Sequence, residues 1–292
     1  MTQLPKIVFF GSGPVASATL QGILPHFDVE AIITKPRAEG HRGSVPVLEL
    51  AESKNIPYFT PRTKKELTEL FADATFTAST GLVVDYGIII SRSVIDYFKK
   101  GIVNSHFSLL PEWRGADPIT FSILGGRPET AGVSLMTIDE KLDEGDLIIQ
   151  KPFILTPTMT TPELTEALVS LSNKLLIDYL PKYIAGDIQP YPQPKTAPTF
   201  SRKLTKEDGI LDTTKPAQQL ALEVRAFAGW PKSKIKLFGH QVVVKKARVA
   251  RDQEDGALVI PCGDASFLEI IELTAPSGRS MSGADFLRGY KK

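Results

Sequence analysis

The sequence contains little of what disulfide or metal chemistry requires. Its 292 residues include one cysteine, Cys262, and four histidines with no H-E-x-x-H pair among them. A single thiol can form neither an internal disulfide nor a cysteine-based metal site. Scattered histidines without that spacing do not predict a catalytic zinc site. We therefore expect no metal ion in the functional site.

Long apolar runs are also missing. No stretch approaches the roughly 18 apolar residues that a membrane-spanning helix needs. The apolar segment near the amino terminus has only about five residues, too few for the core of a signal peptide. We therefore expect a cytoplasmic protein that has no membrane partner.

An excess of charge of one sign is missing from the chain as a whole, whose net charge is +1. Hydrophobic residues make up 42% and charged residues 23%, which is the composition of an ordinary globular protein. Basic residues nevertheless gather in Pro231–Arg248, which contains six of them and no acid. Such a cluster fits either a solvated sheet face or a nucleic-acid contact, and charge alone leaves both open.

Apolar runs alternate with helical patterns over the first two-thirds of the chain. This βαβ order predicts an α/β fold with a Rossmann-like, mostly parallel sheet and helices on both faces. Gly132–Ile138 and Leu147–Leu155 are expected to pair, and a long helix is expected from Thr161 to about Tyr183. The other strands are expected at Lys6–Phe10, Val29–Thr34, Thr75–Val84 and Gly101–His106, and the helices at Val15–Leu24, Leu48–Ser53, Lys64–Phe71 and Ser93–Phe98.

Prolines divide the chain near its last third. Four of them between Ala185 and Arg202 stiffen an extended segment, so we expect domains at residues 1–185 and 203–292 joined by a linker at 186–202. A short helix at about Pro216–Ala226 and several β-rich runs predict that the second domain is a small β-barrel. Its strands are expected at Lys234–Leu237, Gln241–Val249, Ala257–Ile260 and Phe267–Leu273.

Two polar residues end the buried run Gly101–His106. Asn104 and His106 are two residues apart, so on a strand they project from the same face, at the edge where open α/β sheets bind ligands. Asp143 follows another apolar run in a loop. Taken singly, Asn104 suits a turn, His106 suits a core histidine, and Asp143 suits ordinary turn chemistry.

Together, these three side chains would suit acyl transfer to an amine. The carbonyl oxygen gains negative charge as the tetrahedral intermediate forms, and an amide and an imidazole beside it can stabilise that charge. Protons must also leave the attacking amine and reach the leaving nitrogen, and a carboxylate can hold the imidazole in the tautomer that this requires. No G-x-S-x-G nucleophile turn is present in the sequence.

The segment Asn104-Ser105-His106-Phe107-Ser108-Leu109-Leu110-Pro111, followed by Leu142-Asp143-Glu144-Gly145-Asp146, resembles the folate-dependent formyltransferase superfamily. The resemblance implies 10-formyltetrahydrofolate as the formyl donor, with no metal. It implies that Asn104 and His106 stabilise the oxyanion and that Asp143 orients His106 and assists proton transfer through water. Further folate contacts are implied for the segment Ser108, Leu109, Leu110 and Pro111, and for the loop Asp85–Ile90, which would line the pteridine pocket.

Other segments are similar to the superfamily members that act on methionyl-tRNA. They are the Gly11–Ala16 turn, Trp113-Arg114-Gly115-Ala116, Phe200–Asp208 and Val224–Pro231. In those members an OB-like second domain helps to hold the tRNA. The resemblance therefore implies formyl transfer to initiator methionyl-tRNA for translation initiation, by a protein that we expect to be a monomer.

The loop Thr34–Ser44 resembles a basic insertion that approaches the acceptor end of tRNA in those members. Arg37 and Arg42 are its candidate phosphate contacts, and a plain surface loop explains them equally well. The sequence departs from the pattern at three positions. Phe107 and Asp117 stand where small residues are usual, and Glu112 where a basic residue is common.

Three other interpretations remain open. The turn Gly11–Ala16 matches G-x-G-x-x-A, which is typical of NAD(P)-dependent oxidoreductases, but the acidic residue expected about 20 positions later is replaced by the stretch around Lys35. An NADP enzyme could use Lys35 or Arg37. A formyltransferase acting on a sugar-nucleotide amine is the second alternative, and the predicted second domain argues against it. A catalytically inactive tRNA-binding module is the third, disfavoured because all three catalytic positions are filled.

Overall fold

The computed structural model describes residues 4–37, 43–253 and 255–291. The chain forms two compact units that alternate along the sequence. The first unit consists of Met1–Gly115, Gly132–Phe153 and Thr165–Phe200, and the second of Ala116–Ala131, Ile154–Leu164 and Ser201–Lys292. The boundaries expected from composition divide the chain differently and stay a prediction.

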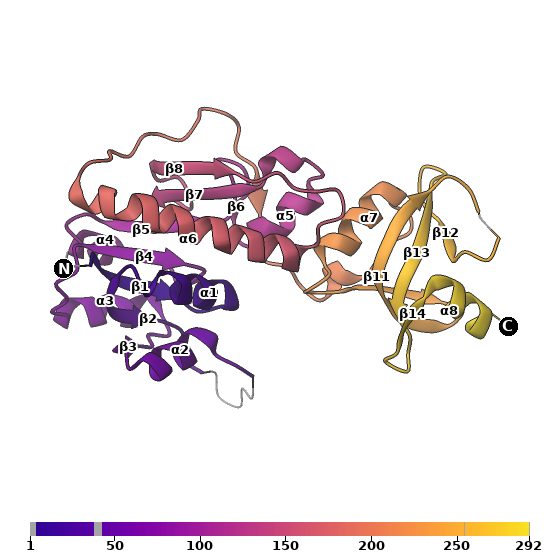
Figure 1. Cartoon of the computed structure of the whole chain (residues 1–292), viewed down its shortest axis with the longest axis horizontal. Helices are drawn as coiled ribbons and strands as arrows, with labels where there is room; N and C mark the ends of the chain where they lie inside the picture. Colours follow the sequence, from indigo (N-terminus) through magenta and orange to yellow (C-terminus); the bar gives the residue numbers. More distant parts are fainter. Residues whose placement is uncertain (1–3, 38–42, 254, 292) are drawn as a thin grey trace. The chain divides into compact units, whose positions relative to one another are not determined.

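The first unit is built on a seven-stranded sheet in the order β3-β2-β1-β4-β5-β7-β8 (Figure 1). The strands from β3 to β5 are parallel, whereas β7 is antiparallel to β5 and β8 is antiparallel to β7. This confirms the mostly parallel, Rossmann-like sheet predicted from the sequence. The strands are β1 (Lys6–Gly11), β2 (Asp28–Ile33), β3 (Tyr58–Phe59), β4 (Thr80–Val84), β5 (Ile102–His106), β7 (Gly132–Thr137) and β8 (Leu147–Pro152).

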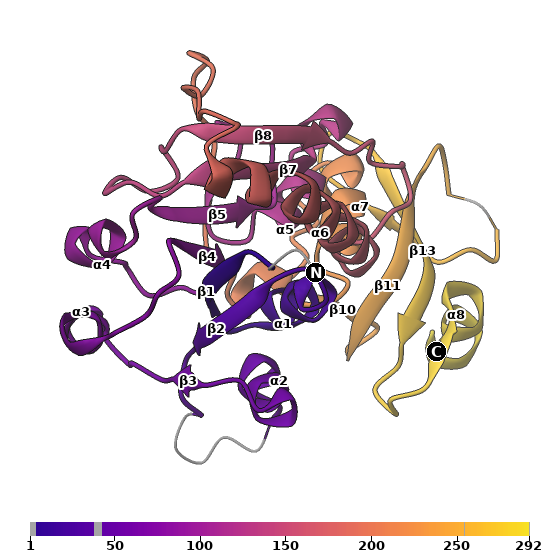
Figure 2. The ribbon, with the colours of Figure 1, turned by 60° about the vertical axis from the view of Figure 1, so that its left-hand side comes forward.

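Helices cover both faces of this sheet (Figure 2). Alternate residues of a strand point to opposite faces, so Val8 and Phe10 of β1 enter a core with Phe71 of α3 and Phe98, the residue after α4. On the other face, α1 lies so close to α6 that a Cβ atom at Gly22 would be 2.1 Å from the amide nitrogen of Asn173. The helices are α1 (Pro14–Ile23), α2 (Pro46–Lys54), α3 (Lys64–Asp73), α4 (Arg92–Tyr97) and α6 (Thr161–Ala185).

The second unit contains a five-stranded antiparallel sheet, curled into a half-barrel, in the order β10-β11-β13-β12 with β14 on β13. Its core packs Leu220 and Val224 of α7 against Val242, Leu268 and Phe286. The predicted fold class, a Rossmann-like domain with a small OB-like β domain, is therefore confirmed. The strands are β10 (Ser233–Leu237), β11 (His240–Ala250), β12 (Val259–Pro261), β13 (Phe267–Thr274) and β14 (Ser280–Ser282).

Several short elements complete the chain. Helix α5 packs against α7 within the second unit. Helix α8 begins after Ser282, whose side chain accepts a hydrogen bond from the Asp285 N–H and so caps the helix. These elements are α5 (Pro118–Leu124), α7 (Ala217–Ala226), α8 (Gly283–Tyr290), the strands β6 (Arg114–Gly115) and β9 (Phe200–Ser201), and two 3-10 turns at Pro128–Thr130 and Glu207–Gly209. Within the described ranges, no helix is both long enough and apolar enough to cross a membrane.

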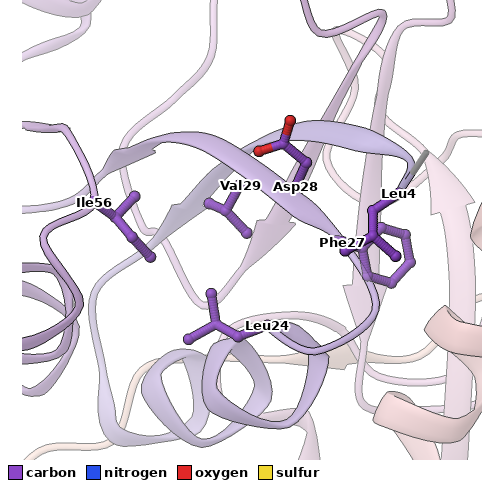
Figure 3. A pocket seen from close by; sticks show the side chains of 6 residues that line it. All are labelled: Leu4, Leu24, Phe27, Asp28, Val29 and Ile56. Atoms are coloured by element: carbon purple, nitrogen blue, oxygen red, sulfur yellow. The ribbon is translucent and has the colours of Figure 1, made fainter. Parts of the chain in front are cut away.

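A hollow of about 450 Å³ lies at the amino ends of β1 and β2 (Figure 3). Asp28 is the charged member of its lining, and the other members are apolar. Open α/β sheets bind ligands at the carboxyl ends of their strands. The hollow therefore lies at the wrong edge of the sheet to be the site predicted around Asn104 and His106. The residues that line it are Leu4, Leu24, Phe27, Asp28, Val29 and Ile56.

Candidate active site

Strand β5 carries the first two predicted catalytic residues to the carboxyl edge of the sheet. It lies between β4 and β7, and its apolar residues Ile102 and Val103 are fully buried. Asn104 is half-buried and pairs with Met136 of β7, whereas His106 is 5% exposed. Both side chains belong to the same face of the strand, as the sequence predicts.

The His106 ring is held from both sides. Its Nε2 atom lies 3.0 Å from the carbonyl oxygen of Trp113. A carbonyl oxygen can only accept, so this contact places a proton on Nε2. Its Nδ1 atom faces the carboxylate of Asp143, with 3.8 Å between Nδ1 and Oδ2. The structure thus brings His106 and Asp143 together, at a distance that suits an ion pair when the ring is protonated and is too long for a hydrogen bond.

Asp143 reaches His106 through an unusual backbone conformation. It lies in the loop between β7 and β8 with φ of 53°, and its Oδ2 atom accepts a hydrogen bond of 2.8 Å from the Gly115 N–H. A non-glycine residue in this left-handed region costs on the order of 1–3 kcal/mol and persists only where its surroundings hold it. This strained conformation directs the Asp143 carboxylate towards the imidazole.

The segment predicted to contact folate follows β5 and is held by two side chains of the neighbouring strands. The Ser134 hydroxyl donates to the carbonyl oxygen of Ser108 at 2.6 Å and accepts from the Leu110 N–H at 3.1 Å. The Gln150 amide donates to the Leu110 carbonyl oxygen at 2.8 Å. These buried bonds fix the backbone of the segment next to His106.

The four predicted folate contacts differ in how far their side chains are buried. Ser108, Leu110 and Pro111 are buried, and Leu110 packs with Met136 in the protein interior. Leu109 is half-buried. Of the four side chains, Leu109 is therefore the most accessible to a ligand, and the others act on a ligand mainly through the backbone they shape.

The loop that follows β4 closes over the glycine turn that follows β1. The Ser12 hydroxyl donates to the carbonyl oxygens of Asp85 and Tyr86, at 3.2 and 3.1 Å. A Cβ atom at Gly13 would lie 2.2 Å from a carboxylate oxygen of Asp85. A dinucleotide enzyme places a pyrophosphate at this helix N-terminus, and a carboxylate there would repel it. The geometry argues against the NAD(P) alternative.

The two predicted tRNA contacts have different outcomes. Arg37 donates to the Gly43 carbonyl oxygen at 3.0 Å and pairs with Glu49 of α2 at 3.3 Å. Hydrogen bonds, first from the Ser44 hydroxyl and then from the Val45 N–H, hold the pKa of Glu49 below its usual value. Arg37 therefore links Gly43 to α2, although its side chain is still 44% exposed. Arg42 lies outside the described residues.

The three residues that depart from the formyltransferase pattern each have a structural explanation. Glu112 accepts a hydrogen bond from the Thr199 hydroxyl, and Asp117 accepts one from the Leu204 N–H at 3.1 Å. Phe107 is 6% exposed and belongs to the core. Both carboxylates therefore fix segments of the chain, and this local role accounts for acidic residues at these two positions.

The basic cluster Pro231–Arg248 is partly neutralised across the curled sheet. Lys245 pairs with Glu272 of β13 at 3.3 Å, and Arg248 pairs with Glu269 at 2.5 Å. Lys236 on β10 makes no ion pair with any residue that the structure describes. A nucleic-acid contact on this unit would draw on β10 more than on β11.

Sequence reasoning missed Gln193. This residue lies in the proline-rich segment, and its side-chain amide donates to the backbone carbonyl oxygens of Asp143 and Gly145 at 2.8 and 2.9 Å. A glutamine between two prolines belongs to no helical or strand periodicity, so the sequence contains no signal for such a contact.

The site joins a buried imidazole, a carboxylate directed at its Nδ1 atom and an amide side chain on the same strand. Such a set can stabilise an oxyanion and move a proton, which is the chemistry of acyl transfer to an amine. Residues 6–180 match the formyl transferase family, and residues 203–291 match the formyl transferase C-terminal domain.

Relatives that match nearly the whole chain show which group of formyl transferases it belongs to. A methionyl-tRNA formyltransferase of Myxococcus xanthus is 35% identical to this chain, over 98% of this chain and 96% of the relative. The protein of the same name from Magnetococcus marinus is 33% identical, over 98% and 95%. The chain therefore belongs to the formyl transferase family, in its methionyl-tRNA formyltransferase group.

Solved structures share the fold at lower identity. An N-formyltransferase of Helicobacter canadensis, in complex with folinic acid and dTDP-3-aminofucose, superposes with a TM-score of 0.70 at 19% identity, over 91% of this chain and 99% of that one. HypX of Aquifex aeolicus in complex with tetrahydrofolic acid gives 0.63 at 14%, over 100% of this chain and 48% of HypX.

Proposed function

We propose that this protein transfers the formyl group of 10-formyltetrahydrofolate to the amino group of initiator methionyl-tRNA. The product is N-formylmethionyl-tRNA, which serves translation initiation. The observation that carries the proposal is the full-length match to methionyl-tRNA formyltransferases, in both the catalytic and the C-terminal family regions. The pairing of His106 with Asp143 at the carboxyl edge of the sheet also supports the proposal, because this pair suits acyl transfer to an amine.

In the proposed reaction the neutral amine attacks the formyl carbon, and the carbonyl oxygen becomes an oxyanion. Asn104 stabilises that oxygen, and His106 does so when its Nδ1 atom carries a proton. Because Nε2–H of His106 is engaged by the Trp113 carbonyl, Nδ1 is the ring atom left to act. Asp143 balances the charge of the ring when Nδ1 is protonated. As the tetrahedral intermediate collapses, the carbon–nitrogen bond to the folate breaks, the attacking amine loses a proton and the folate nitrogen gains one.

A sugar-nucleotide amine is the alternative acceptor. The likeness to the Helicobacter canadensis enzyme supports a shared fold, and at 19% identity it does not extend to the acceptor. One assay separates the two acceptors: labelled formyl-folate is offered with methionyl-tRNA and, separately, with amino-sugar nucleotides. We expect label in methionyl-tRNA. Label in the sugar nucleotide alone would overturn the proposed acceptor.

Replacing His106 or Asp143 by Ala should lower kcat by at least about 100-fold, the scale of one lost group that stabilises the transition state. Methionyl-tRNA should still bind, because neither side chain is exposed enough to supply much contact surface. Single-turnover formylation and a filter-binding measurement test the two parts separately.

His26→Ala is the matched control, because His26 is exposed and lies in the turn before β2. It should keep full turnover. Near-normal kcat in either His106→Ala or Asp143→Ala would show that the proposed roles are wrong.

A further inference from the structure

The proline-rich segment that follows α6 is anchored to the site at two points, Tyr191 and Thr199. Tyr191 forms an antiparallel bridge with Leu147, the first residue of β8, through two backbone hydrogen bonds of 2.7 and 2.9 Å. From Tyr191 to Phe200, Gln193 and Thr199 are half-buried and the other residues are exposed. The two inward-facing residues are therefore the candidates for a function in this segment.

Gln193 uses both N–H donors and the oxygen of its amide group on the Asp143 loop and its neighbour Arg114. Its nitrogen donates to the carbonyl oxygens of Asp143 and Gly145, at 2.8 and 2.9 Å. Its oxygen accepts from Arg114 at 2.7 Å, and the same guanidinium pairs with Glu144 at 3.0 Å. One side chain thus links the backbone on both sides of Glu144 to Arg114.

These bonds act where the loop is strained. Asp143 occupies the left-handed region, a conformation that relaxes unless neighbouring groups hold it. The two carbonyl oxygens bound by Gln193 belong to Asp143 itself and to Gly145, so the amide holds the strained residue directly. If that hold were lost, the Gly115 N–H would still bind Oδ2, but the backbone that carries the carboxylate could relax and move it from its position 3.8 Å from Nδ1 of His106.

Thr199 supports the other side of the imidazole. Its hydroxyl accepts a hydrogen bond from the Trp113 N–H at 2.8 Å, and its carbonyl oxygen accepts from the Arg114 N–H at 2.9 Å. Trp113 supplies the carbonyl oxygen that holds Nε2–H of His106. The same extended segment therefore fixes both the carbonyl group and the carboxylate between which the ring lies.

We propose that Gln193 is a positioning residue for catalysis, which acts by holding Asp143 against His106. The proposal adds a residue to the site, and its kinetic tests rest on the proposed function. Gln193 itself touches no reacting atom; it contacts Arg114 and the carbonyl oxygens of Asp143 and Gly145. A misplacement of about 1 Å in a catalytic group can cost on the order of 100-fold in rate.

Gln193→Ala should therefore lower kcat for formylation by about 10- to 100-fold and leave the KM for methionyl-tRNA unchanged. Gln193→Glu should be equally impaired, because it keeps an acceptor for Arg114 and loses both donors to the loop. The matched control is Gln189→Ala: Gln189 is exposed in the same segment, and among the residues that the structure describes its side chain bonds only the Gly186 carbonyl oxygen. That variant should keep the kcat of the unmodified protein.

A double-mutant cycle separates positioning from general destabilisation. In an Asp143→Ala background there is no carboxylate to position, so Gln193→Ala should cause less than about a twofold further loss of kcat. If Gln193→Ala caused the same loss of kcat with and without Asp143, or if Gln193→Glu kept full kcat, the proposal would be overturned.

A spectroscopic arm needs no turnover, so it can be read even if the unmodified protein formylates no amine. The ring nitrogen resonances of His106 are recorded by NMR in the unmodified protein and in the Gln193→Ala and Asp143→Ala variants. We expect Gln193→Ala to move them towards their positions in Asp143→Ala, and Gln189→Ala to leave them in place. Unchanged His106 resonances in Gln193→Ala would contradict the positioning role, independently of the acceptor.

Discussion

At the residue scale, the site depends on backbone conformations that side-chain-bearing residues rarely adopt. Asp85, Trp113 and Asp143 all have positive φ, at 47°, 57° and 53°. Each belongs to a loop at the site: Asp85 closes over Gly13, Trp113 holds Nε2 of His106, and Asp143 faces Nδ1. Strain of this kind gathers at functional sites because it directs groups that a relaxed loop would leave pointing elsewhere.

Gly145 lets the loop that carries Asp143 approach β7 closely. A Cβ atom at Gly145 would lie 1.7 Å from the carbonyl oxygen of Thr137, a backbone atom that cannot turn aside. Gly145→Ala should therefore push the loop away from β7, lower both Tm and kcat, and leave the KM for methionyl-tRNA nearly unchanged. Thermal unfolding and steady-state kinetics measure these effects.

Gly289→Ala in α8 is the matched control, because a Cβ atom there meets nothing within 4 Å. Alanine in a helix is favoured over glycine by up to about 1 kcal/mol, so this variant should be as stable as the unmodified protein or slightly more so. A Gly145→Ala variant with unchanged kcat would show that the loop can move without displacing the Asp143 carboxylate.

At the scale of elements, the strands buried on both faces were predictable because their apolar runs are continuous. β1, β2 and β5 agree with the sequence predictions within one or two residues. The strand predicted at Thr75–Val84 is shorter in the structure, where β4 begins only at Thr80. The two-residue β3 and the seven-residue α5 are too short to show a period. Hydrophobic periodicity in the sequence therefore identifies only elements that are long enough to contain more than one period.

The candidate site was predictable in its residue types and only partly in its geometry. Asn104, His106 and Asp143 stand out as polar residues at the ends of apolar runs, and the resemblance to the formyltransferases joins them into one site. The partners of His106 and Asp143 could not, because the Trp113 carbonyl oxygen and the Gly115 N–H are backbone groups that every residue possesses. Backbone hydrogen bonds of this kind become visible only when the chain is folded.

The 3-10 turn Glu207–Gly209 shows how one acidic side chain organises the start of the C-terminal stretch of the second unit. The hydrogen bond from Arg202 holds the pKa of Asp208 well below its usual value, and bonds from Thr205 add to the effect. A carboxyl group with a lowered pKa in the folded state stabilises that state above its unfolded pKa of about 3.9. The stabilisation is lost as the pH falls towards the lower, folded value.

Asp208→Asn should therefore lower Tm at pH 7, and the difference from the unmodified protein should shrink as the pH falls below about 4. Thermal unfolding between pH 7 and pH 3 measures it. Asp252→Asn, at an exposed carboxyl group in the turn after β11, should leave Tm unchanged throughout. A constant Tm difference between Asp208→Asn and the unmodified protein at every pH would mean that the charge of Asp208 is not what stabilises the turn.

At the scale of the whole molecule, the two compact units do not follow the order of the sequence. Two stretches from the middle of the chain, residues 116–131 and 154–164, belong to the unit that contains the C-terminal sheet. Within that unit the Thr161 hydroxyl donates to the Ala226 carbonyl oxygen at 2.6 Å, and Arg225 donates to the Met159 carbonyl oxygen at 3.1 Å. Composition could mark the proline-rich segment, but it could not reveal that the short helix α5 packs against α7 and so belongs to the second unit.

The two divisions of the chain predict different behaviour for a protein that ends at Phe200. If residues 1–185 were a self-sufficient domain, this shortened protein should unfold at the temperature of the intact chain. If the contacts define the units, α5 loses α7 as its packing partner and the apolar side chains of Ile119 and Ile123 lose part of their cover. Because burying such a side chain contributes about 1.5–3 kcal/mol, we expect a clearly lower Tm and binding of the dye ANS, which reports exposed apolar surface.

Replacing Ile119 and Ile123 by Ser in the shortened protein should then reduce ANS binding, whereas the same replacements in the intact chain should lower its Tm. A shortened protein with the Tm of the intact chain and no ANS binding would show instead that α5 needs no partner from the C-terminal stretch.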